Sequence, residues 1–231
     1  RAAADNAPDH PGIAVWLGHV LEDVGEAEAA ADAYARAHAL APEEPQIAAY
    51  LLAWRRKLCD WRDLDSLAAQ VRAAVNAGTA SVEPFAFLSE DASAVEQLRC
   101  ARLRAGILAQ QVQPMPPAAS TPNERLRVGF LSNGFGAHPT GLLTAALFEQ
   151  LRAVDEFDAH LFALNRADGS PIRQRLEAAA HVHDVAQQPH AHIAQRIRDA
   201  RIDVLFDLRG WGGGGTPEVL AVPPAPGLVD W

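Results

Sequence analysis

The sequence predicts a chain of two parts, an all-α N-terminal region followed by an α/β region with a parallel sheet. Three observations lead to this prediction. A stretch of eight residues recurs in related form, helical apolar spacing continues up to residue 112, and strand-like and helix-like segments alternate from residue 125 onwards. The proline-rich segment 113–124 lies between the two patterns and is typical of a linker.

The repeat is visible when residues 7–14 are compared with residues 41–48. Five of the eight residues are identical, and the offset of 34 residues is the period of the tetratricopeptide repeat, a pair of helices. The expected small and large side chains occur at Leu17, Gly18, Leu21, Ala30, Tyr34, Ala37 and Pro42. We expect a tetratricopeptide repeat over 1–45, as the end of a longer array, because one unit cannot bury its apolar face alone.

The repeat pattern decays after Pro45, although helical patterns continue. The segments 47–58, 63–76 and 92–111 carry apolar residues at helical spacing. We interpret residues 46–112 as a helical connector that leads into the α/β region.

The region 125–231 alternates between the two kinds of secondary structure. The expected strands are 126–131, 157–164, 183–185, 202–208 and 228–231, and the expected helices are 140–153, 171–180, 190–200 and 217–221. Alternation of this kind predicts a parallel sheet with helices on both faces. Ligands of such sheets bind where the strands end.

Composition and charge argue against several functions. The 29 acidic and 20 basic residues give a net charge of −9, which disfavours nucleic acid and anionic membrane surfaces as partners. The sequence contains no apolar run long enough to cross a membrane. Two cysteines, Cys59 and Cys100, are too few for a disulfide framework. Together with the lack of a signal-peptide pattern, they predict a reducing, cytoplasmic location.

The turn after the first expected strand is the strongest candidate for a functional site. Gly134 and Gly136 allow the backbone to turn sharply and to approach a ligand closely. His138-Pro139-Thr140 then opens a helix, whose first N–H groups are free to bind an anion. Histidine side chains can act as general acids or bases, so His138 is a candidate for catalysis or binding.

A second glycine-rich segment follows the strand expected at 202–208. Gly210, Gly212 and Gly215 match the G-x-G-x-x-G pattern of dinucleotide-binding proteins. The context does not fit, because prolines end the next helix within about two turns, whereas a crossover needs about a dozen residues. We interpret the segment as a loop that lies against a ligand, with a plain flexible loop as the alternative.

Other polar residues leave alternatives open. Four histidines surround one short strand and the helix after it: His181, His183, His190 and His192. They lack a cysteine or acidic partner at ligand spacing, so we interpret them as solvated surface residues and expect no metal site. His160 alternates with apolar neighbours and is expected to be partly buried. Arg209 could pair with Asp207 or face an anion.

The motif Gly-Phe-Gly-Ala-His-Pro-Thr at 134–140 resembles the start of the catalytic region of the O-linked N-acetylglucosamine transferases, and the bacterial members above all. Further matches are Cys-Asp-Trp at 59–61, Asp-Gly at 168–169, the strand and glycine-rich loop at 203–215, and Pro-Ala-Pro at 224–226. In that family, tetratricopeptide repeats and a helical connector precede a two-lobed glycosyltransferase of the GT-B type. The resemblance implies that residues 125–231 form most of its first, Rossmann-like lobe.

The resemblance also implies an activity. The family transfers N-acetylglucosamine from UDP-N-acetylglucosamine (UDP-GlcNAc) to Ser and Thr hydroxyls of proteins, inverts the sugar carbon, and uses neither a metal nor another cofactor. On this basis His138 is the catalytic base or a sugar contact. The residues expected to line the sugar and its donor are Pro139, Thr140, Gly212, Gly213 and Gly214. The repeats would bind protein or peptide acceptors.

Two departures from the family pattern affect the identity of the base. Many members carry Asp where this chain has Gly134, and the animal enzymes carry His where it has Phe85. Two alternatives to the transferase are a GDP-fucose-dependent protein O-fucosyltransferase of the Spindly type and a non-catalytic, repeat-based interaction protein. The second lobe, which in the family supplies most UDP contacts, is expected to lie outside these 231 residues, so we expect the 231-residue piece alone to be inactive.

Overall fold

The computed structural model describes residues 7, 9–116, 118 and 124–231. The chain divides into two compact units, Arg1–Arg104 and Ala105–Trp231. The expected linker at 113–124 lies partly outside the described residues, and the expected domain limits remain predictions.

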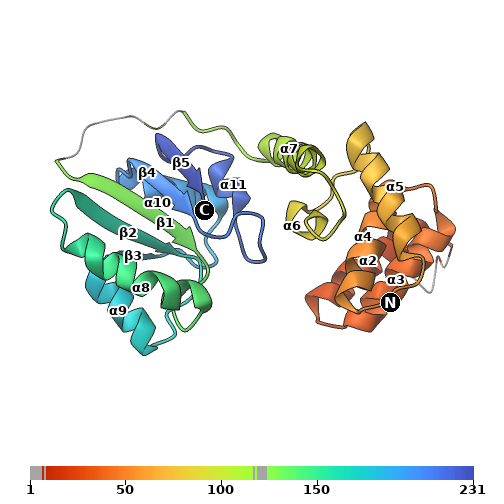
Figure 1. Ribbon diagram of the computed structural model, residues 1–231, viewed down its shortest axis with the longest axis horizontal. Coiled ribbons are helices and arrows are strands. Elements are labelled where there is room, and N and C mark those ends of the chain that lie inside the picture. The colour runs from red at the N-terminus through yellow and green to blue at the C-terminus, as the bar shows by residue number, and fades with distance from the viewer. Residues whose placement is uncertain (1–6, 8, 117, 119–123) are drawn as a thin grey trace. The chain divides into compact units, whose positions relative to one another are not determined.

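The first unit is helical, as predicted (Figure 1). Its helices, including α7, which runs on into the second unit, are α2 (Pro11–Asp23), α3 (Ala27–Leu40), α4 (Pro45–Lys57), α5 (Leu64–Ala77), α6 (Pro84–Phe87) and α7 (Ala94–Gln111). Gly18 lies under the ring of Tyr34, where a Cβ atom would be 2.5 Å from the nearest ring carbon. This close approach of α2 to α3 explains why the repeat needs glycine at that position.

The second unit contains a five-stranded sheet in the order β3-β2-β1-β4-β5, in which every pairing is parallel. The strands are β1 (Leu126–Ser132), β2 (Phe157–Ala163), β3 (His181–Asp184), β4 (Val204–Asp207) and β5 (Gly227–Asp230). The helices between them are α8 (Pro139–Arg152), α9 (Pro171–Ala179), α10 (His190–Asp199) and α11 (Pro217–Leu220). The predicted fold class is therefore confirmed.

Alternate residues of the strands build two separate cores. On one face, Phe130 and Leu161 pack with Phe148 of α8 and with residues of α9. On the other face, Leu131 and Phe162 pack with residues of α10 and α11. Strands buried on both faces read as continuous apolar runs, which is the pattern that the sequence shows.

The direction in which successive strands are added to the sheet reverses beside β1. From β1 the chain moves outward to β2 and β3, then crosses back to β4 and β5 on the other side of β1. In open parallel sheets the crevice at such a reversal is the usual ligand site. Here it lies between the segments that follow β1 and β4.

The interpretation of His183 as a solvated surface residue is wrong. Its ring is half-buried and stacks on Phe162, and its Nε2 lies 3.0 Å from Nδ1 of the buried His160. Burial lowers the pKa of His183 to about 4, with smaller contributions from His160, Arg196 and His181. The sequence signal was weak because β3 is only four residues long and its neighbour in space is β2.

The lowered pKa predicts a pH-dependent stability. In the unfolded chain His183 binds a proton near its ordinary pKa of 6.5. In the folded chain it binds a proton only near pH 4. The folded state therefore loses stability as the pH falls through this window. His183→Leu should lose less stability than the unaltered chain between pH 6.5 and pH 4, as measured by urea unfolding at each pH. His192→Leu alters an exposed histidine and should follow the unaltered chain; equal behaviour of both variants would contradict the prediction.

Candidate functional site

The two segments singled out from the sequence meet at the end of β1. The side chain of Asn133 donates from Nδ2 to the carbonyl oxygen of Gly213 at 3.3 Å. Gly214 has a left-handed backbone, and a Cβ atom there would lie 2.0 Å from the same Asn133 nitrogen. Asn133 therefore joins the turn that carries His138 to the loop that contains Gly212.

The turn between β1 and α8 is too crowded for side chains at its glycine positions. A Cβ atom at Gly134 would lie 2.4 Å from His138 Nδ1, and one at Gly136 would lie 2.4 Å from Asp168 Oδ2. A Cβ atom at Gly141, in the first turn of α8, would lie 2.3 Å from the carbonyl oxygen of Gly136. None of the three has a positive φ, so glycine is required here for close packing and not for an unusual backbone angle.

His138 is the N-cap residue of α8. Its backbone is extended, with φ −136° and ψ 152°, and its Nδ1 accepts a hydrogen bond from the backbone N–H of Thr140 at 3.1 Å. Pro139 occupies the first helical position, where no N–H is needed. The imidazole of His138 is only partly buried, and among the described residues its ring hydrogen bond is the one that Nδ1 accepts from Thr140.

The capping bond decides what the free nitrogen of His138 does. A neutral imidazole carries one proton, and a nitrogen that accepts a hydrogen bond does not hold it. With Nδ1 as acceptor, the proton of the neutral ring is on Nε2. In this arrangement Nε2 donates a hydrogen bond, and the ring accepts a further proton only if Nδ1 releases Thr140.

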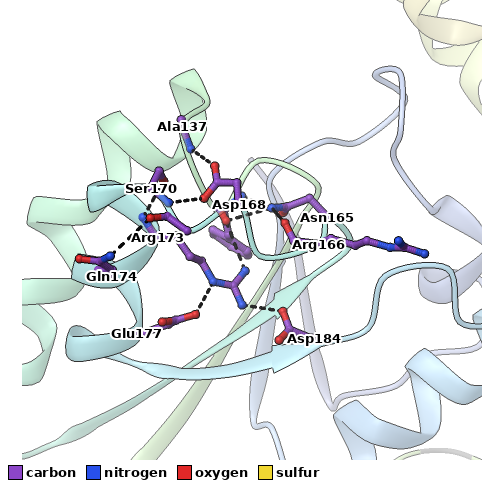
Figure 2. A network of polar contacts seen from close by, with 11 residues as sticks. Ala137, Asn165, Arg166, Asp168, Ser170, Arg173, Gln174, Glu177 and Asp184 are labelled. Carbon is purple, nitrogen blue, oxygen red and sulfur yellow. Dashed lines mark hydrogen bonds and ion pairs between the residues drawn. The ribbon is translucent and has the colours of Figure 1, made fainter.

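Residues of the β2–α9 segment hold the turn in place, as Figure 2 shows. The Asn165 side chain makes two hydrogen bonds with the backbone of Phe135. Its Oδ1 accepts from the N–H and its Nδ2 donates to the carbonyl oxygen, each at 3.0 Å. The Asp168 carboxylate accepts from the N–H groups of Ala137, at 2.7 Å, and Ser170, at 3.0 Å. These two N–H donors lower the pKa of Asp168 to about 2.

A fully buried arginine, Arg173, also contacts this turn (Figure 2). The Arg173 guanidinium donates to Glu177 at 2.7 Å and to Asp184 at 2.5 Å, and its third contact is the carbonyl oxygen of Phe135 at 3.4 Å. Sequence reasoning missed Arg173, because an arginine in a short amphipathic helix is usually exposed. It also gave no role to Asp168, although Asp-Gly at 168–169 was among the matching motifs.

The structure tests one of the two alternatives for Arg209, the pairing with Asp207. Its guanidinium donates to the carbonyl oxygen of Gly213, while its backbone N–H donates to Asp207 Oδ1 at 3.0 Å. Asp207 is buried, and this burial raises the pKa of its carboxyl. Arg209 thus shapes the glycine-rich loop instead of forming an ion pair with Asp207.

The candidate site is an open edge of the sheet in the described part of the unit. Two hollows, of about 410 and 400 Å³, lie elsewhere. One is near Arg125 and His181, and the other is an apolar hollow near Phe206 and Trp231. Among the described residues no cluster of three or more His, Cys, Asp or Glu side chains is arranged to hold a metal, and no helix is long and apolar enough to cross a membrane.

A crevice at the reversal of a parallel sheet, framed by a glycine-rich loop and a helix N-terminus, is typical of proteins that bind nucleotides. Comparison with known proteins narrows this class. Residues 92–231 match the sequence model of glycosyl transferase family 41, and the chain belongs to that family.

Two curated relatives agree with this assignment, and a solved structure shares the fold. A probable UDP-N-acetylglucosamine–peptide N-acetylglucosaminyltransferase, SEC, of Arabidopsis thaliana is 30% identical over 75% of this chain and 19% of its own length. A UDP-N-acetylglucosamine–peptide N-acetylglucosaminyltransferase of Caenorhabditis elegans is 31% identical over 47% of this chain and 10% of its own. A mutant of the Thermobaculum terrenum O-GlcNAc transferase shares the fold, with a TM-score of 0.57 and 22% identity over 99% of this chain and 45% of its own. The chain thus spans a fifth or less of these curated relatives.

The crowding at Gly134 predicts a loss of stability on substitution. In Gly134→Ala the new methyl group must displace the His138 ring from Thr140, so the capping bond is lost. We expect the free energy of unfolding to fall by about 1–3 kcal/mol in a urea titration. The control is Gly213→Ala, because a Cβ atom there meets nothing within 4 Å. A change of less than about 0.5 kcal/mol is expected for it; similar losses in both variants would refute the packing argument.

Proposed function

We propose that this chain forms part of a protein O-GlcNAc transferase, which moves N-acetylglucosamine from UDP-GlcNAc to Ser and Thr hydroxyls of proteins. The observation that carries the proposal is the meeting of the His138 turn and the Gly212–Gly214 loop at the reversal of the sheet, in a chain of glycosyl transferase family 41. The names of the two curated relatives support UDP-GlcNAc as donor and a peptide as acceptor.

The proposed reaction is a direct displacement that inverts the sugar carbon. The acceptor oxygen forms a bond to C1 of the sugar, the bond from C1 to the diphosphate oxygen breaks, and the hydroxyl proton leaves to a base. Negative charge grows on the departing UDP. Fixed N–H donors stabilise such charge better than water does, because they are oriented before the reaction begins.

His138 supplies a donor of this kind. Its Nε2–H lies at the N-terminus of α8, where the helix dipole is positive, whereas the N–H groups of Thr140 and Leu142 are already bonded to His138. We therefore assign His138 a hydrogen-bonding role toward the sugar or the leaving diphosphate. Pro139 and Thr140 line the sugar beside it.

The Gly212–Gly214 loop offers the donor a backbone without side chains. Gly213 and Gly214 are exposed. The side chains of Asn133 and Arg209 hold the loop by donating hydrogen bonds to the carbonyl oxygen of Gly213. A ligand can approach such a backbone closely. This arrangement supports donor contact and not a merely flexible loop.

The helical unit has the form of a tetratricopeptide pair, and such repeats present surfaces to extended peptides. We assign it the binding of protein acceptors, in a cytoplasmic enzyme. The matched part of this chain covers only 19% of the length of the Arabidopsis relative, which is consistent with a second lobe in the whole protein. We therefore expect turnover only from a form that contains both lobes.

Two substitutions separate capping from chemistry at His138. In the full-length enzyme His138→Ala removes both the cap and the Nε2 donor. His138→Asn keeps a good capping residue but has no donor at the position of Nε2, because its amide N–H groups end closer to the backbone. His138→Ala should lose about 1 kcal/mol of stability and His138→Asn much less. Both should lower the transfer rate, on the order of 10²-fold, as loss of a preorganised donor does.

The measurements are thermal melting and initial rates with UDP-GlcNAc, and with GDP-fucose as the competing donor. Normal turnover by His138→Asn would show that the histidine only caps the helix. Turnover with GDP-fucose alone would favour the fucosyltransferase, and failure of either donor to bind would favour an interaction protein.

A further inference from the structure

We propose that Asp168 is a positioning residue for His138, holding the histidine in the orientation in which Nε2 is the donor. The inference deepens the proposed function and rests on it for its kinetic part. Its structural part concerns the 231-residue chain itself.

The first step is the contact nearest to the histidine. Asp168 comes from the segment after β2, yet its Oδ2 accepts from the N–H of Ala137, the residue directly before His138, at 2.7 Å. The other carboxylate oxygen accepts from Ser170, which caps α9. One side chain therefore fixes the peptide that enters His138 relative to the start of another helix (Figure 2).

The second step is that the contact leaves the turn little freedom. A Cβ atom at Gly136 would lie 2.4 Å from Asp168 Oδ2, so the carboxylate lies directly against the backbone. The N–H of His138 donates to the carbonyl oxygen of Gly136 at 2.7 Å. The backbone just before His138 is thus held at Gly136 and Ala137 together.

The third step separates Asp168 from the residues that only support the fold. Asn165 and Arg173 act on Phe135, whose ring is fully buried in the core, so their loss disturbs packing. Asp168 is exposed and fills no core space. Its removal changes the direction of the turn more than it changes the core.

The consequence concerns the proton on the imidazole. The bond from Thr140 to Nδ1 requires the extended backbone that His138 adopts here. When the peptide at Ala137 is released, that bond weakens, and Nδ1 competes with Nε2 for the proton. The side chain then presents a mixture of donor and acceptor to the ligand.

The direct test is ¹⁵N NMR of the His138 ring in the 231-residue chain. The unaltered chain should show one tautomer with the proton on Nε2, and Asp168→Ala should show a mixture. Glu149→Ala is the matched control, because Glu149 also joins α8 to α9, through Arg175 at 2.8 Å. It should leave the His138 signals unchanged. A single unchanged tautomer in Asp168→Ala would overturn the proposal, whatever the enzyme's activity.

The kinetic test uses the full-length enzyme and a double-mutant cycle. Asp168→Ala should lower kcat on the order of 10- to 100-fold, as misplacement of a catalytic group does. Asp168→Asn keeps one acceptor oxygen, so its kcat should lie between those of the unaltered enzyme and Asp168→Ala. In a His138→Asn background, Asp168→Ala should cause no further loss, because it acts through the histidine. Additive losses would assign Asp168 a purely structural role. A normal rate in His138→Asn would instead contradict the role proposed for His138 in transfer, while the NMR result would still stand.

Discussion

The structure of the sheet unit depends on β1 being hydrogen-bonded on both sides. All seven of its residues pair with β2, and four of them also pair with β4. A strand held in this way cannot shift its register without moving both halves of the sheet. The segment that leaves β1 therefore begins from a fixed point, which lies where the order of the strands in the sheet reverses. This is why a short turn can place a histidine accurately without a surrounding cavity.

The same constraint explains the glycines. Because β1 and α8 are both fixed by their packing, the turn between them must fit a limited space, and Gly134, Gly136 and Gly141 approach other atoms too closely for a Cβ. A larger side chain at Gly134, such as aspartate, cannot coexist with the present His138 ring position. In this chain the capping tautomer of His138 depends on Gly134.

Most of the fold could be predicted from the sequence, because strand and helix patterns are local. β1, β2 and β5 begin or end within one or two residues of expectation, and Pro139 marks the start of α8 as expected. The four-residue helix α6 was missed, because one turn is too short to show a period. The partners of Asp168 and Arg173 could not be predicted either. These contacts join segments about 30 to 40 residues apart in the chain, and only the parallel pairing of β1 with β2 brings them together.

Under the proposed function, the charge of the chain limits how it can bind the anionic donor. With a net charge of −9, it must place positive features locally. The carboxylates near the site are occupied or disfavoured as ions: Asp168 is bound by two N–H groups, and burial raises the pKa of Asp207. One N–H of the Arg209 guanidinium is bound to the carbonyl of Gly213. Under the proposed function, the Nε2–H of His138, at the positive end of the α8 dipole, is an oriented donor for the diphosphate on this lobe. Asp168, as the residue proposed to orient this donor, therefore affects diphosphate binding although it carries no positive charge.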